Sequence, residues 1–171
     1  MGIHRLNHAV LYVRDVAVAV EFYSSVLGFT VAVEMAGQAA FLRAPESTND
    51  HDLGLFAQGA HAEASTAGRG AVGLYHLAWE VNTLSDLAEL RSRLSVAGAL
   101  TGASDHGTTK SLYGRDPDGL EFEIVWLVPA HLLTPDLTMT TRPLDLDREI
   151  ERYGAATRSG LGISVPLGVS V

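Results

Sequence analysis

Apolar and polar positions follow a pattern that occurs twice along the chain. The stretch "LNHAVLYVRDV" at residues 6–16 recurs in type as "LYHLAWEVNTL" at 74–84, with a histidine in third place of an extended, apolar-rich run each time. A segment with apolar residues every three or four positions follows each run, which predicts a helix. The chain is therefore predicted to contain one structural unit written twice.

The predicted helices have start and stop signals of the usual kinds. Asp15 can cap the first helix, and Gly28 can end it. Thr83 with Asp86 three residues later resembles a capping box, and Gly98 can end the second helix. Both units are thus expected to begin with a strand followed by a helix.

Short strand-like pieces complete each unit, so that the predicted order is βαβββ, twice, at about residues 4–58 and 74–128. This predicts an α+β fold in which the two units form a curved mixed sheet around a cavity. Residues 59–73 are expected to be a connector. We expect one module over residues 1–131 and a C-terminal extension over 132–171, with a short helix in "RPLDLDREIERYG", packed on the body or on a second subunit.

Alternation along the strands predicts which side chains a helix covers. The covered face of the last strand is expected to contain Phe122, Ile124 and Trp126, and that of the strand near residue 78 to contain Tyr75, Leu77, Trp79 and Val81. His8, His76 and Glu123 then lie on the uncovered faces. A buried carboxylate such as Glu123 needs a cation, a proton or hydrogen-bond donors.

Composition restricts the chemistry. The chain has no cysteine, which excludes disulfides, thiolate catalysis and cysteine-bound metals, so any metal must be bound by His, Asp or Glu. Its 12 basic and 20 acidic residues give a net charge of -8, which works against binding to nucleic acid or anionic membrane. No apolar run approaches the roughly 18 residues of a membrane span. We expect a cytoplasmic protein with small-molecule partners.

Two imidazoles and one carboxylate form the facial triad of non-haem Fe(II) enzymes, which leaves three metal positions for substrate and oxygen. His8, His76 and Glu123 are the candidate metal ligands. A single strand histidine is more often a hydrogen-bonded core residue than a ligand, and Glu121 is a rival carboxylate on the same face. The matching places of the two histidines in duplicated units favour ligation.

The stretch from His106 to Glu123 has a more specific pattern. It reads His106, "GTTKS", Leu112-Tyr113, "GR", the turn "DPDG", "LEF" and Glu123. This resembles the signature of the vicinal oxygen chelate superfamily, and within it the extradiol ring-cleaving enzymes of the catechol 2,3-dioxygenase type, over residues 4 to about 130. Only Ser104, two residues before the histidine, departs from the pattern.

The resemblance implies a metal in the cavity, Fe(II) or alternatively Mn(II), and cleavage of a catechol-like substrate beside its diol with O2. Tyr113 and His106 would contact the bound substrate, and His51, just before "DLGLF", would be the acid and base. Tyr113 as a core residue and His51 as a loop residue are the ordinary alternatives. Many such enzymes contain two modules, so we expect either a homo-oligomer or the C-terminal extension to fill the place of the second.

Two other functions on the same fold remain open. Glyoxalase-like isomerases and epimerases commonly take a fourth ligand from the last strand of the first unit. Laying that strand on "LEFEIVW" puts Gly54 at or near the counterpart of Glu123, where no ligand exists. Metal-free, drug-binding resistance proteins generally lack the metal residues, which this chain retains.

Overall fold

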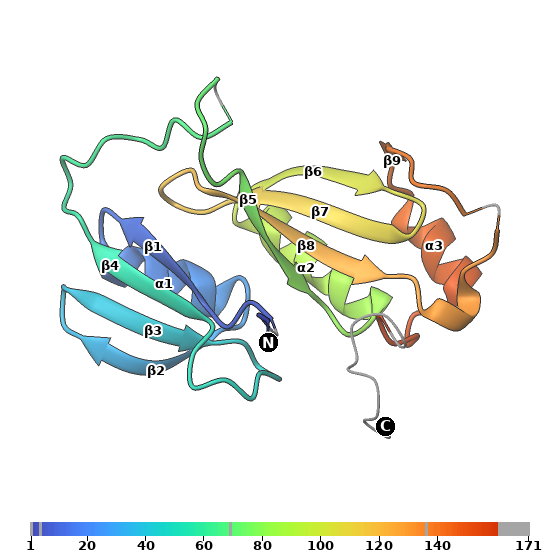
Figure 1. Cartoon of the computed structure of the whole chain (residues 1–171), viewed down its shortest axis with the longest axis horizontal. Helices are drawn as coiled ribbons and strands as arrows, with labels where there is room; N and C mark the ends of the chain where they lie inside the picture. Colours follow the sequence, from blue (N-terminus) through green and yellow to red (C-terminus); the bar gives the residue numbers. More distant parts are fainter. Residues whose placement is uncertain (1, 4, 69, 136, 161–171) are drawn as a thin grey trace. The chain divides into compact units, whose positions relative to one another are not determined.

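The computed structural model describes residues 2–3, 5–68, 70–135 and 137–160. Their contacts divide the chain into two compact units, which are described separately (Figure 1). The first unit contains Met1–Gly70 with Asp116–Leu120, and the second contains Ala71–Arg115 with Glu121–Val171. Residue 136 and residues 161–171 of the predicted C-terminal extension lie outside the described residues.

The first unit has the predicted βαβββ order. Its elements are β1 (Ala9–Val13), α1 (Val16–Ser25), β2 (Thr30–Met35), β3 (Ala39–Arg43) and β4 (Leu53–Ala57). The sheet has the strand order β1-β4-β3-β2, with β1 parallel to β4 and the other pairs antiparallel. The unit also includes the turn at Asp116–Leu120, where Arg14 forms an ion pair with Asp118 (Nη1 to Oδ1 2.7 Å) and the Tyr23 hydroxyl donates to Asp116.

The second unit repeats this order and then extends it. Its elements are β5 (His76–Glu80), α2 (Leu84–Val96), β6 (Leu100–Asp105), β7 (Thr109–Arg115), β8 (Glu121–Leu127), a 3-10 turn η1 (Ala130–Leu132), β9 (Arg142–Pro143) and α3 (Leu146–Tyr153). The sheet order is β5-β8-β7-β6-β9, with β5 parallel to β8. The predicted α+β class and both βαβββ units are confirmed, as mixed sheets; the cavity stays a prediction.

Local signals explain where the two longer helices begin and end. The Asp15 side chain accepts from two backbone N–H groups at the start of α1, and Thr83 and Asp86 form a reciprocal capping box at the start of α2. Gly28 and Gly98 follow these helices with φ of 82° and 65°, in the left-handed region that glycine adopts without strain. All four signals were predicted from the sequence.

Each helix packs on one face of its own sheet, as the alternation predicts. In the first unit the buried side chains on this face include Leu11, Val13, Leu53 and Leu55. In the second unit they include Phe122, Ile124 and Trp126. One expectation is wrong: Tyr75 is 59% exposed rather than covered by α2, because it precedes β5 and lies against the ring of His76 instead.

The described part of the C-terminal extension belongs to the second unit. Strand β9 pairs with β6, and α3 packs beside α2. Lys110 on β7 is fully buried, and its Nζ contacts Asp105 and, at 3.0 Å, Oε2 of Glu149 on α3. A buried ammonium with two carboxylates therefore connects this extension to the sheet. The predicted helix in this segment is confirmed, whereas β9 was not predicted.

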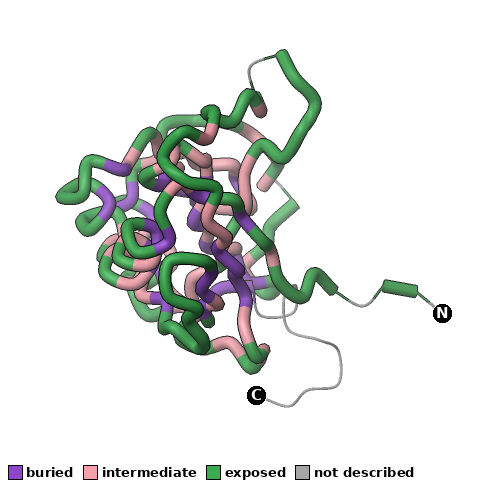
Figure 2. The backbone as a smooth tube through the Cα atoms, turned by 90° about the vertical axis from the view of Figure 1, so that its left-hand side faces the viewer, coloured by how far each residue is buried: buried purple, intermediate pink, exposed green. Residues whose placement is uncertain are grey.

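The connector between the units is exposed along most of its length, in contrast to the partly buried strands on either side (Figure 2). Small residues dominate it, and its described residues form no helix. Among the residues that the structure describes, no helix is both long and apolar enough to cross a membrane.

Candidate functional site

His76 and Glu123 come together on neighbouring strands of the second unit. His76 begins β5, and Glu123 lies on the adjacent parallel strand β8, on the sheet face away from α2. His76 Nε2 is 3.1 Å from Glu123 Oε2, and the Glu123 side chain is only 14% exposed. Two neighbouring ligands of one metal, each about 2.1 Å from it, lie about 3 Å apart. The pair thus fits two positions of a divalent metal.

The other carboxylate on this face is already occupied. Glu121 forms an ion pair with Arg115, with Nη2 2.5 Å from Oε1. In the part of the chain that the structure describes, the Glu123 side chain, by contrast, makes polar contacts only with the Nε2 side of His76 and with Tyr113. The other ring nitrogen of His76, Nδ1, is buried and has no hydrogen-bond partner among the described residues. A cation bound by both the imidazole nitrogen and the carboxylate oxygen would satisfy the two atoms together, so the His76–Glu123 pair is chemically suited to metal binding. This favours Glu123 over Glu121 as the ligand.

Tyr113 lies directly opposite Glu123 on the antiparallel strand β7. The Tyr113 hydroxyl oxygen is 2.8 Å from His106 Nε2 and 3.4 Å from Glu123 Oε1. Burial, and secondly the negative charge of Glu123, raise the pKa of the Tyr113 hydroxyl, which therefore stays protonated near neutral pH. A polar chain runs from Glu123 through Tyr113 to His106.

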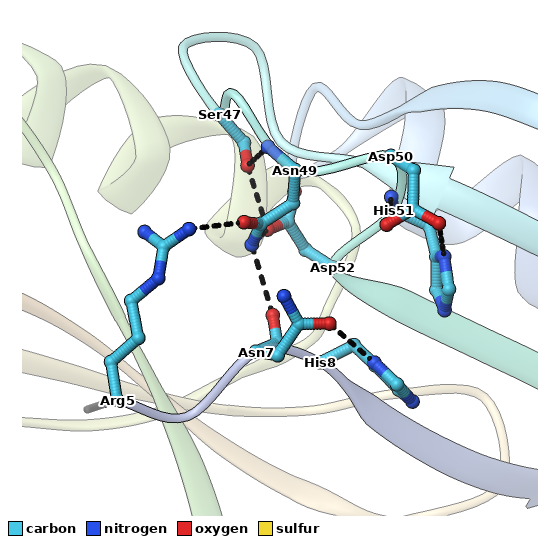
Figure 3. Close-up of polar contacts among 8 residues, drawn as sticks. All are labelled: Arg5, Asn7, His8, Ser47, Asn49, Asp50, His51 and Asp52. Carbon is cyan, nitrogen blue, oxygen red and sulfur yellow. Dashed lines mark hydrogen bonds and ion pairs between the residues drawn. The ribbon is translucent and has the colours of Figure 1, made fainter. Parts of the chain in front are cut away.

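In the first unit, His8 and His51 are neighbours, with ring centroids 4.5 Å apart. His8 immediately precedes β1, and His51 precedes β4, which pairs with β1. His8 Nδ1 is 2.8 Å from Asn7 Oδ1, and His51 Nδ1 is 3.2 Å from Asp50 Oδ2 (Figure 3). An acceptor at Nδ1 leaves Nε2 of a neutral histidine without a hydrogen, free to bind a metal or accept a proton.

A polar network supports the segments that carry these two histidines (Figure 3). The buried carboxylate of Asp52 accepts from the Ala44 N–H, the Ser47 hydroxyl and the Asn49 amide. Asn49 also donates to the Asn7 carbonyl at 2.9 Å. The loop before β4 is therefore bonded to the segment before β1, which explains why the two histidines lie side by side.

Gly54 takes the place in the first unit that Glu123 takes in the second. In the parallel pairs, Gly54 is opposite the residue two places after His8, and Glu123 is opposite the residue two places after His76. A Cβ atom at Gly54 would lie 3.3 Å from a Val10 methyl. This part of the first unit thus has neither a carboxylate nor free room for one.

Each unit brings together part of the predicted residue set. The second unit joins His76, Glu123, Tyr113 and His106, and the first joins His8 and His51. Within each unit taken by itself, the described residues form no group of three or more His, Asp or Glu that could bind a metal. Whether His8 binds a metal with His76 and Glu123 therefore remains a prediction.

The sequence reasoning missed the groups that accept from the histidines. Asn7 and Asp50 each precede a singled-out histidine, so their positions were a usable signal. The acceptor of His106 Nδ1 is the backbone carbonyl of Thr140, 2.9 Å away. A pattern of side chains cannot reveal that a histidine contacts a main-chain carbonyl 34 residues further along the chain.

Comparison with known proteins identifies one superfamily over most of the chain. Residues 5–124 match the Glyoxalase/Bleomycin resistance protein/Dioxygenase superfamily. The chain is 28% identical over 161 residues to catechol-2,3-dioxygenase of Bacillus subtilis, covering 91% of this chain and 54% of that protein. It is 35% identical over 123 residues to biphenyl-2,3-diol 1,2-dioxygenase 3 of Rhodococcus globerulus, covering 70% and 62%. The chain thus spans little more than half the length of these two relatives.

Other similar proteins have different names. Virulence protein STM3117 of Salmonella typhimurium is 30% identical over 128 residues, covering 72% of this chain and 85% of that protein. A glyoxylase/bleomycin resistance protein/dioxygenase domain from Frankia has a TM-score of 0.59 at 24% identity, covering 72% and 92%. Lactoylglutathione lyase of Agrobacterium tumefaciens has a TM-score of 0.55 at 22% identity, covering 73% and 95%. At these identities, the two structures establish the fold alone.

Proposed function

The chain belongs to the Glyoxalase/Bleomycin resistance protein/Dioxygenase superfamily, and from this premise we propose that it is an Fe(II)-dependent extradiol dioxygenase. Its substrates are a catechol-like small molecule and O2. The metal ligands are His8, His76 and Glu123, with Mn(II) as the alternative metal. The dioxygenases among its relatives support this reaction class.

The observation that carries the proposal is the contact between His76 Nε2 and Glu123 Oε2 at 3.1 Å, with Tyr113 beside it. It provides two ligand atoms of the types that Fe(II) binds, next to a hydroxyl that can contact a bound substrate. His8, the third ligand, is proposed from the sequence repeat. Its Nδ1 is occupied by Asn7, so Nε2 is available.

Fe(II) held by His8, His76 and Glu123 would supply a binding site for the catechol and O2 and a route for electron transfer between them. The Tyr113 hydroxyl holds the substrate oxygen nearest Glu123 by a hydrogen bond, and His106 supports that hydroxyl. His51 would accept a proton from the catechol and return it later in the reaction, because an acceptor at its Nδ1, Asp50, leaves Nε2 of the neutral ring without a hydrogen.

The equivalence of Gly54 and Glu123 favours this reaction over a glyoxalase-like isomerisation. A four-ligand site would need a carboxylate near Gly54, where a Cβ would already lie 3.3 Å from a Val10 methyl and 3.6 Å from the Phe41 ring. The three-ligand set leaves more metal positions open for substrate and O2. A metal-free, drug-binding resistance protein does not need a histidine and a carboxylate in the close contact that His76 and Glu123 make.

We also propose that the protein acts in the cytoplasm as a homo-oligomer, without nucleic acid or membrane partners. Its net charge of -8 opposes attraction to either polyanionic surface. A homo-oligomer would place further copies of the two βαβββ units beside this one by symmetry.

The test is anaerobic loading with Fe(II), followed by a panel of catechols monitored for oxygen uptake and a yellow ring-opened product. We expect oxygen uptake in a one-to-one ratio with catechol. Loading with Mn(II) in parallel identifies the preferred metal. Stoichiometric metal binding without oxygen uptake, together with isomerisation of a thiol adduct, would establish the glyoxalase-like alternative instead.

A further inference from the structure

His106 is held at both ring nitrogens. Nδ1 lies 2.9 Å from the carbonyl oxygen of Thr140, and Nε2 lies 2.8 Å from the Tyr113 hydroxyl. A carbonyl oxygen only accepts hydrogen bonds, so the ring hydrogen of neutral His106 lies on Nδ1. Nε2 is then bare and accepts the hydroxyl hydrogen of Tyr113.

This arrangement determines where the single hydroxyl hydrogen of Tyr113 points. Two acceptors compete for it: His106 Nε2 at 2.8 Å and Glu123 Oε1 at 3.4 Å. The shorter distance favours His106 as the acceptor. The Glu123 carboxylate then keeps its lone pairs, and the Tyr113 oxygen can accept from a substrate hydroxyl.

The segment that supplies the Thr140 carbonyl is residues 138–143, here called the C-terminal strap. It contacts the His106 loop closely, since a Cβ atom at Gly107 would lie 2.2 Å from the Thr138 carbonyl oxygen. The Thr140 N–H donates to the His106 carbonyl at 3.3 Å, and β9 pairs with β6 just before this loop. The strap therefore contacts the His106 loop at several successive backbone positions.

The strap is also anchored at its far end. Helix α3 begins three residues after β9, and its Glu149 is 6% exposed and paired with the fully buried Lys110 of β7. Lys110 also contacts Asp105, which precedes His106. The carbonyl of Thr140 is thus held in place by both the sheet and α3.

We propose that the main-chain carbonyl of Thr140 is a positioning group: it fixes the Nδ1-H tautomer of His106 and thereby aims the Tyr113 hydroxyl hydrogen at His106 and away from Glu123. The benefit to catalysis rests on the proposed function, whereas the tautomer is a property of the protein alone. A neutral histidine side chain in water favours the Nε2-H form, and protonated and bare ring nitrogens differ in 15N shift, so the Nδ1-H form can be recognised by NMR.

The experiment measures the ring 15N shifts of His106 by NMR in the full-length, metal-free protein, at a pH where the ring is neutral. We expect a protonated Nδ1 and a bare Nε2. Gly107→Ala pushes the added methyl group against the Thr138 carbonyl, and we expect the Nε2-H form to appear. In the Fe(II)-loaded enzyme, kcat for catechol should fall about tenfold or more, with metal affinity changed less than about twofold.

Two controls isolate the carbonyl. Gly98→Ala places alanine at a similar φ of 65° but with open space around its Cβ, so the His106 tautomer should not change. Among the described residues, the Thr141 hydroxyl, 3.3 Å away, is the only side-chain hydroxyl within hydrogen-bonding distance of Nδ1. Thr141→Val removes it and should also leave the tautomer unchanged. A flipped tautomer in Thr141→Val would assign the positioning to that hydroxyl and overturn the proposal.

An Nε2-H form in the wild-type protein would overturn the proposal without any variant, so it remains testable even if Gly107→Ala does not fold. A folded Gly107→Ala protein with the wild-type tautomer would also overturn it. If the predicted tautomers are found but no catechol is cleaved, the proposed function fails while the assignment of Thr140 stands.

Discussion

Gly54 and Glu123 occupy equivalent positions in the two units, one opposite the residue two places after His8 and the other opposite the residue two places after His76. Only the second unit has a carboxylate at this position. The two repeats therefore differ in side-chain chemistry at this position, and a substitution at Glu123 has no equivalent carboxylate in the first unit to compensate for it.

Glu123→Gln should abolish high-affinity metal binding while the protein stays folded, because the amide keeps the size of the side chain but loses its charge and its basic oxygen. We expect the affinity for Fe(II) or Mn(II), measured by anaerobic calorimetry, to fall about 100-fold or more. Glu121→Gln is the matched control, since Glu121 pairs with Arg115. An equal fall in metal affinity in the two variants would contradict the assignment of Glu123 as the ligand.

Tyr113→Phe should separate metal binding from turnover. The hydroxyl contacts His106 and Glu123 but is not a proposed ligand, so metal affinity should change little. Removing one hydrogen-bonding group from the reacting oxygen should lower kcat by about 100-fold. Steady-state oxygen uptake with a metal titration checks this. Unchanged turnover, or loss of the metal, would show that the hydroxyl has another role.

His51→Ala should keep metal and catechol binding and lose about 100-fold in kcat, the scale of a positioned acid and base. His61→Ala is the control, because His61 lies exposed in the connector. Oxygen uptake and binding of catechol under nitrogen distinguish the two effects. A large loss only in the His61 variant would move the acid and base into the connector.

Lys110→Met should destabilise the protein by about 3–5 kcal/mol, because it leaves the buried carboxylate of Glu149 without its cation. Urea unfolding followed by fluorescence measures the change. Arg115→Met breaks an exposed ion pair and should cost under about 1 kcal/mol. The double variant Lys110→Met/Glu149→Leu should recover much of the loss, since it removes both buried charges.

Asp116 should give the first unit a pH-dependent stability. Burial raises the pKa of its carboxyl above the ordinary value, so the folded state binds the proton more tightly than the unfolded state does. Its contribution to stability is then greatest at low pH and is lost as pH rises from about 4 through the folded pKa. The free energy of unfolding relative to Asp116→Asn should fall over that range. A flat difference would contradict the raised pKa.

The strands, helices and caps were predictable because their signals are local. Asp15, Thr83 and Gly98 begin or end a helix through contacts within one helical turn. The alternation of buried and less buried residues along β8 determines which face of the sheet carries Glu123. The repeat then indicated that His8 and His76 are equivalent. These are short-range or symmetric relationships, which a single sequence displays directly.

Other features depend on distant, non-repeated partners. The exposure of Tyr75 follows from where β5 begins, and the pairing of Lys110 with Glu149 joins residues far apart in sequence. Strand β9 is only two residues long and includes a proline, so it has no alternation of apolar and polar residues from which it could be predicted. The part of the site formed by Thr140 was therefore not predictable from residue patterns.

The acceptor for His106 is a main-chain atom, and this has an evolutionary consequence. Every residue type at position 140 carries the same carbonyl, so substitutions there can accumulate without changing the contact. Proline is the exception, since the Thr140 N–H also donates to His106. The contact depends on the path of the backbone at residue 140 rather than on the identity of its side chain. Related proteins can therefore keep the same carbonyl contact to the histidine with different residues at this position.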